Sequence, residues 1–138
     1  MQLGIAEILM KASELKTKQE KIDYLRKNYN VGVGVMLKMA FDPNLKWALP
    51  EGSPPYTESK VDDSEGMLYN EIRRLYLFHE GGNPGLSKAR REILFQQLLE
   101  SLDKNDAKLL LAVKDKKLPY KGLTRKIIEE AYPALLVY

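Results

Sequence analysis

The chain has 138 residues, of which 44% are hydrophobic and 30% charged, with a formal net charge of +3. This is the size and balance of one globular domain, residues 1–138, which we expect to bury about two thirds of its unfolded surface. The sequence lacks cysteine, so it predicts no disulfide and no thiolate site. It also lacks an apolar run approaching the ~18 residues of a membrane span and a signal-peptide pattern, so it predicts a cytoplasmic protein with no membrane contact.

The first thirty residues predict two helices. Apolar residues at helical spacing mark the first, from about Leu3 to Leu15. Thr17 is expected to cap the second, and Glu20 completes a capping box. Asn28 and Asn30 indicate where this helix stops. Its buried stripe is expected to consist of Ile22, Leu25 and Tyr29.

The next segment combines a buried helix with an irregular stretch. Residues 31–41, VGVGVMLKMAF, fit a buried helix that ends at Asp42-Pro43, although the β-branched start also permits a strand. A short helical turn around Trp47 is expected to follow, with the indole in the core. A Pro-rich irregular loop is then predicted around residues 49–63.

Two further helices are predicted on either side of a glycine-rich break. Ser64 is expected to cap a helix, and Gly81 to Gly85 end it. Ser87 is expected to cap the next helix, from about Leu86 to Leu102. The stripe of the first helix is predicted as Leu68, Ile72, Leu75, Tyr76 and His79, and the inward face of the second as Ile93, Leu94, Gln97, Leu98 and Ser101.

The last third predicts two more helices. Asp103 is expected to cap one that stops near Lys117, because Pro119 cannot continue a helix. Thr124 is expected to cap the last helix, Arg125 to Ala131, which Pro133 ends. No segment alternates with period two. The predicted fold is therefore all-α, a single compact domain of six to eight short helices.

Cations gather toward the C-terminus. Between residues 104 and 126, eight Lys or Arg residues stand against Asp106 and Asp115, a net charge of +6. Such asymmetry indicates a polyanionic partner, DNA in our hypothesis, while a solvated lysine face is the alternative. A second group, Lys88, Arg90 and Arg91, lies in the first turns of the helix predicted from about Leu86 to Leu102. The helix dipole disfavours cations there, and a bound phosphate would offset this unfavourable interaction. The candidate phosphate contacts are Lys88, Arg90, Arg91, Lys117, Lys121, Arg125 and Lys126.

The sequence offers little catalytic chemistry. His79 is the only histidine and lies at helical spacing with apolar residues, which favours a helix-face position over a base or ligand. Asp62-Asp63 with Glu65 lack the glycine-punctuated spacing of a calcium loop. Gly32-x-Gly34 lacks the preceding strand and third glycine of a dinucleotide motif. We therefore expect no enzyme activity, no metal and no cofactor.

Most of the chain resembles one group of phage proteins. The stretches concerned are residues 17–56 (TKQEKIDYLRKNYNVGVGVMLKMAFDPNLKWALPEGSPPY), RRLYLFHEGGNPGLSKARREILFQQLLESL and DAKLLLAVKDKKLPYKGLTRKIIEEAYP. They resemble a family of small uncharacterised proteins of T4-like tailed phages, especially those of marine cyanobacteria. The resemblance implies a phage-encoded protein acting in the host cytoplasm.

The layout is more remotely similar to the N-terminal DNA-binding domain of T-even-type ATP-dependent DNA ligases. The matching closing pieces are Leu109 to Val113, Tyr120 to Thr124 and Tyr132-Pro133-Ala134-Leu135. In those ligases the domain holds duplex DNA across the minor groove, largely by phosphate contacts. Ligase activity is not implied, because Lys114-Asp115-Lys116 does not reproduce the KxDG motif. The contacts that the resemblance implies are Lys121, Gly122, Thr124, Arg125 and Lys126.

Two functions are therefore expected, in order of preference. The first is a non-enzymatic phage DNA-binding accessory protein that contacts the phosphate backbone with weak sequence selectivity. The alternative is a protein–protein interaction module that binds a phage or host factor through the Pro-rich loop or through the apolar tail, residues 134–138.

Overall fold

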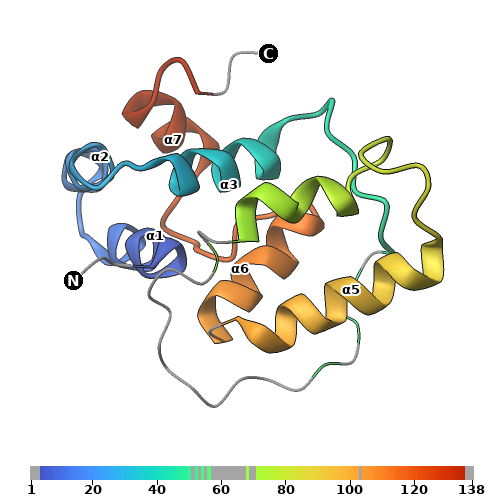
Figure 1. The fold of residues 1–138 in the computed structure, drawn as a ribbon. Coiled ribbons are helices and arrows are strands. Elements are labelled where there is room, and N and C mark those ends of the chain that lie inside the picture. The colour runs from blue at the N-terminus through green and yellow to red at the C-terminus, as the bar shows by residue number, and fades with distance from the viewer. Residues whose placement is uncertain are drawn as a thin grey trace.

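The computed structural model describes residues 4–50, 52, 54, 56, 68, 71–102 and 104–135. In these residues it contains six α-helices, one 3-10 helix and no strand, which confirms the all-α prediction. The elements are α1 (Ile5–Glu14), α2 (Lys18–Lys27), α3 (Val31–Phe41), η1 (Ile72–Phe78), α5 (Lys88–Ser101), α6 (Lys104–Lys114) and α7 (Arg125–Ala131) (Figure 1).

Helix α6 lies at the centre of the arrangement. Both α1 and α3 pack on it, α2 joins α1 to α7, and α5 packs on η1. The buried apolar side chains form one cluster to which every helix contributes. The N-terminal end of α5 and helix α7 lie at opposite sides of the view in Figure 1. This separation decides which of the predicted cations can act together.

Short polar side chains start four of the helices. The side-chain oxygens of Thr17, Ser87 and Thr124 accept hydrogen bonds from the third amide of α2, α5 and α7, at 3.1, 3.2 and 3.3 Å. These three predicted caps are confirmed. Asn30 was expected only to end α2, but its Oδ1 accepts a hydrogen bond of 2.9 Å from the Val33 amide and starts α3. The segment is thus helical from Val31, and the strand alternative is wrong.

The prediction of a helical turn around Trp47 is wrong. This segment forms a β-bridge with the residues at the end of η1 and just after it. The Ala48 amide donates to the Phe78 carbonyl at 2.7 Å, and the Glu80 amide donates to the Lys46 carbonyl at 2.8 Å. Trp47 is buried as predicted, and its indole meets the imidazole of His79 edge-on with ring centroids 4.5 Å apart. His79 lies just beyond η1 rather than on a helical stripe.

The predicted inward face of α5 is wrong in part, because Leu94 and Leu98 pack against the core as predicted but are only partly buried. The structure buries Phe95 and Leu99, whereas Ile93 is 47% exposed. The helix carries apolar residues on more than one face, and packing against η1 selects which face is buried. Tyr29 and Tyr76, expected in buried stripes, are each about half exposed.

Several predictions lie outside the described residues. These are the caps Ser64 and Asp103, the carboxylates Asp62, Asp63 and Glu65, most of the Pro-rich loop, and residues 136–138 of the apolar tail. Leu135 of that tail packs partly on the core. Within the described part of the chain, no helix has the length and apolar character needed to cross a bilayer.

Candidate nucleic-acid interface

Residues 115–124 connect α6 to α7 and are fixed at several points; we call them the 115–124 connection. Lys116 takes up the left-handed conformation, with φ of 62°, and turns the chain after α6. Its Nζ donates to the carbonyls of Met39 and Asp42, each at 2.8 Å, and so occupies the C-terminal end of α3. The helix ends at Lys114, slightly before the predicted stop near Lys117.

Gly122 holds the connection against the N-terminal helices. Its carbonyl accepts a hydrogen bond of 2.9 Å from the Nζ of Lys21 in α2. A Cβ atom at this position would lie 2.4 Å from the carbonyl oxygen of Ser13 in α1. The close approach requires glycine, so Gly122 acts in packing. Thr124 likewise uses its hydroxyl to cap α7.

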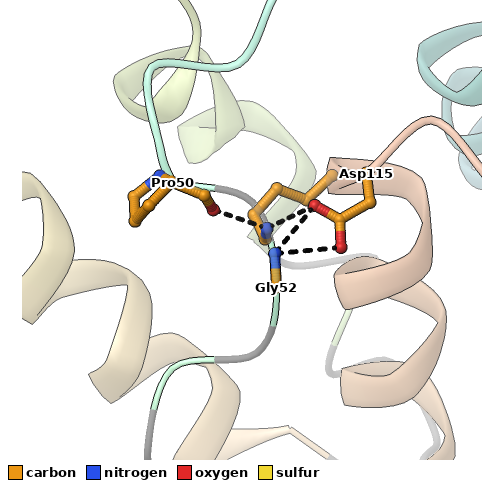
Figure 2. Close-up of polar contacts among 4 residues, drawn as sticks. Pro50, Gly52 and Asp115 are labelled. Atoms are coloured by element: carbon orange, nitrogen blue, oxygen red, sulfur yellow. Dashed lines mark hydrogen bonds and ion pairs between the residues drawn. The ribbon is translucent and has the colours of Figure 1, made fainter.

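Two cations of the basic stretch are withdrawn from the surface. The Lys114 side chain is only 2% exposed, and its Nζ donates to the Pro50 carbonyl at 2.8 Å and to Asp115 Oδ1 at 2.6 Å. Asp115 in turn accepts from the Gly52 amide at 3.3 and 3.4 Å (Figure 2). Lys116 is half-buried against α3. Both therefore join elements together and add no charge that a partner could use.

The remaining cations of this segment differ in their partners. Arg125 pairs with Glu129 at 2.8 Å, and its guanidinium lies 5.8 Å from the ring centroid of Phe41. Lys117, Lys121 and Lys126 are exposed. They form no ion pair within the part of the chain that the structure describes. These three lysines are the predicted contacts of this segment that stay available, and we refer to the three together as the basic surface.

The second predicted group is not brought to this surface. Lys88 and Arg90 are exposed at the start of α5, across the molecule from α7 (Figure 1). Arg91 is occupied, because its guanidinium donates to the carbonyls of Leu77, Asn83 and Leu86 at 3.0, 3.2 and 3.1 Å. Arg91 thus fixes the glycine-rich turn before α5. The sequence could not show this, because the acceptors are backbone carbonyls.

A hollow opens beside Lys121, between α1, α6 and the 115–124 connection. Its volume is about 380 Å³, and both Lys108 of α6 and Lys121 line it. Sequence reasoning counted Lys108 in the basic stretch but did not include it in the site, because only the packing of α6 on α1 places it there. The lining residues are Met10, Ser13, Glu14, Asn105, Lys108, Pro119, Tyr120 and Lys121.

Two titratable groups near the connection are shifted toward their neutral forms. Burial, with a smaller contribution from the charge of Asp106, raises the pKa of the Tyr120 hydroxyl, which stays protonated at neutral pH. Burial, with a smaller contribution from Lys116, lowers the pKa of His79. Among the described residues, no group of three or more His, Asp or Glu side chains is arranged to hold a metal ion.

The sequence pattern of a Family of unknown function (DUF6433) matches residues 8–120. The chain belongs to this family. The matched segment begins within α1 and ends at Tyr120, so it contains the lining of the hollow up to that residue. Helix α7 and Lys121 lie beyond the match. No curated protein and no solved structure matches the chain.

Proposed function

We propose that this protein is a non-enzymatic, phage-encoded DNA-binding accessory protein that contacts the phosphate backbone through the basic surface. One observation carries the proposal: Lys121, which has no ion-pair partner among the described residues, and Lys108 converge on one hollow from segments that are apart in the sequence. The resemblance to the DNA-binding domain of T-even-type ligases supports the same choice of partner.

The arrangement suits phosphate contact for an electrostatic reason. A lysine without an acidic partner can neutralise a phosphate and release its counterion, which supplies most of the free energy of non-specific DNA binding. The hydrogen bond of 2.9 Å from Lys21 to Gly122 holds the connection in place before DNA arrives, so little conformational entropy is lost on binding. Because these contacts reach phosphates rather than base edges, binding is weakly selective for sequence.

A salt series with two matched double variants tests the proposal. Lys121→Glu with Lys126→Glu reverses two charges on the basic surface, and Lys88→Glu with Arg90→Glu makes the same change in net charge at the start of α5. We expect the first variant to bind labelled duplex at least about tenfold more weakly than the wild type. Its slope of log affinity against log salt should fall by about 0.9 for each phosphate that the variant no longer neutralises. The second variant should bind nearly as the wild type does.

Two results would reject the proposal. One is the absence of duplex binding by the wild-type protein even at low salt. The other is an equal loss of affinity in the two double variants, because this would reflect net charge rather than a particular surface. Circular dichroism of each variant establishes that the fold is retained.

A second candidate, a protein-interaction module, is favoured by exposed side chains between α2 and α3 and by a hollow at the tail. Val31 is 73% exposed and Tyr29 49%, and the Tyr29 ring lies 5.0 Å from that of Tyr132. A shallow hollow of about 390 Å³ is lined by Tyr29, Tyr132, Pro133, Ala134 and Leu135. This function predicts a complex that persists at high salt and after nuclease treatment, whereas phosphate contacts weaken as salt rises.

A further inference from the structure

The hollow beside Lys121 has the size of a small-molecule site and a lining of mixed apolar and charged residues. Its volume of about 380 Å³ lies within the range of roughly 300–1,000 Å³ that small-molecule sites occupy. Met10, Pro119 and Tyr120 are the residues of the lining that can supply apolar contact. Any nucleobase can stack on such a surface, because every base has a π face.

The charged side chains of the hollow distinguish a nucleotide from a simple anion. Lys108 and Lys121 would attract phosphate, but Glu14 lines the same space. Glu14 has no ion-pair partner in the described part of the chain. A bare phosphate would meet repulsion from this carboxylate. A nucleotide avoids it, because its base can donate a hydrogen bond to Glu14 while its phosphates face the lysines.

From this lining we infer that the hollow binds a nucleobase of an unpaired nucleotide in DNA, with Lys108 and Lys121 at the adjoining phosphates and Glu14 accepting from the base. The inference rests on the proposed function and specifies which DNA the protein prefers. Extruding a paired base costs a few kcal/mol, and this cost is smallest where a base is already unpaired. Bulges, gaps and single-stranded ends therefore supply the ligand.

The carboxylate also sets a preference among bases. Adenine and cytosine each present an exocyclic amine that donates to a carboxylate. The imide N–H of thymine lies between two carbonyl oxygens, which a carboxylate repels. Glu14 therefore favours an unpaired adenine over an unpaired thymine.

The inference is tested with three labelled duplexes of equal length: one fully paired, one with a single bulged adenine and one with a single bulged thymine. We expect the wild-type protein to bind the adenine bulge about tenfold more tightly than the paired duplex. Glu14→Gln, which keeps the shape of the side chain, should reduce the preference for adenine over thymine by several-fold. The matched control is Glu80→Gln, since Glu80 is exposed and does not line the hollow.

The possible outcomes separate this inference from the proposed function. Equal affinity for all three duplexes would overturn the nucleobase site and leave phosphate-backbone binding intact. An adenine preference that Glu14→Gln and Glu80→Gln change equally would also overturn it. If none of the duplexes binds at low salt, the proposed function itself is wrong and the inference falls with it.

Discussion

At the level of single residues, Gly122 and Arg91 fulfil structural roles that their sequence neighbourhoods do not reveal. Both stood among the expected DNA contacts. Gly122 instead lies where a Cβ would meet the Ser13 carbonyl at 2.4 Å. Arg91 uses its guanidinium to bond three backbone carbonyls. The residue type alone indicates a charge at Arg91 and a flexible position at Gly122. The backbone carbonyls that these residues contact belong to other segments, which the local sequence does not reveal.

Gly122→Ala is expected to destabilise the protein by about 1–3 kcal/mol, the usual cost of adding an atom to a closely packed site. The neighbouring atom is a backbone carbonyl oxygen, so either α1 or the 115–124 connection must shift. Urea unfolding measures the change. Gly85→Ala serves as the control, because its nearest neighbour would be Asn83 Oδ1 at 3.6 Å. A cost for Gly122→Ala no larger than that of the control would contradict the packing role.

His79 gives the stability a defined pH dependence. Burial and the charge of Lys116 lower the pKa of the folded-state imidazole below its usual value of 6.5. As pH falls below about 6.5, the unfolded chain therefore binds more protons than the folded one, and the free energy of unfolding decreases. The free energy of unfolding is therefore greatest above about pH 6.5 and decreases as the pH falls toward the folded-state pKa of His79.

The measurement is a series of urea unfolding curves from about pH 7.5 to pH 5.5, the range in which histidine titrates. Wild-type stability should decline toward the acidic end, and His79→Gln should give a flatter dependence, whatever its stability at neutral pH. A variant with the same slope as the wild type would show that other groups cause the decline.

At the level of elements, the end of α6 is tied to the Pro-rich loop through a partly buried ion pair between Lys114 and Asp115. Lys114 and Asp115 each also bond that loop, through the Pro50 carbonyl and the Gly52 amide (Figure 2). Removing one partner of a buried pair leaves the other charge uncompensated, which is more costly than losing a surface contact. The tie therefore gives an irregular segment a fixed point on the helical body.

Asp115→Ala should accordingly destabilise the protein by about 1–3 kcal/mol. Glu129→Ala is the comparison, because it removes an exposed ion pair with Arg125 that should contribute no more than about 0.5 kcal/mol. Urea unfolding of both variants at neutral pH tests the difference. Equal, small costs would mean that the Lys114 ammonium is satisfied without the carboxylate.

At the level of the whole molecule, the exposed cations predicted to contact DNA do not all lie in one region. Helix α7 lies at one side, and the start of α5 lies at the other (Figure 1). The predicted cations therefore do not converge on a single binding surface, although the basic sequence indicates one. The separation is also what makes the two double variants of the DNA-binding test a matched pair, since they alter charge at distant places on one fold.

The sequence by itself determined the helical class, the helix starts at Thr17, Ser87 and Thr124, and the breaks around the glycine-rich turn. Caps and breaks are local, because the side chain and the amide it serves are three residues apart. The buried residues of α1 also follow its sequence, since Ile5, Ile8 and Leu9 form a single apolar stripe.

Only the tertiary structure decided which face of α5 is buried, that Trp47 pairs with His79, and which lysines stay at the surface. Each of these depends on a neighbour that is distant in the chain. Lys114 and Lys121 carry the same side chain on adjacent segments, yet one is buried against Asp115 and the other is exposed beside a hollow. Charge and periodicity are properties of one segment, whereas burial and pairing are properties of two.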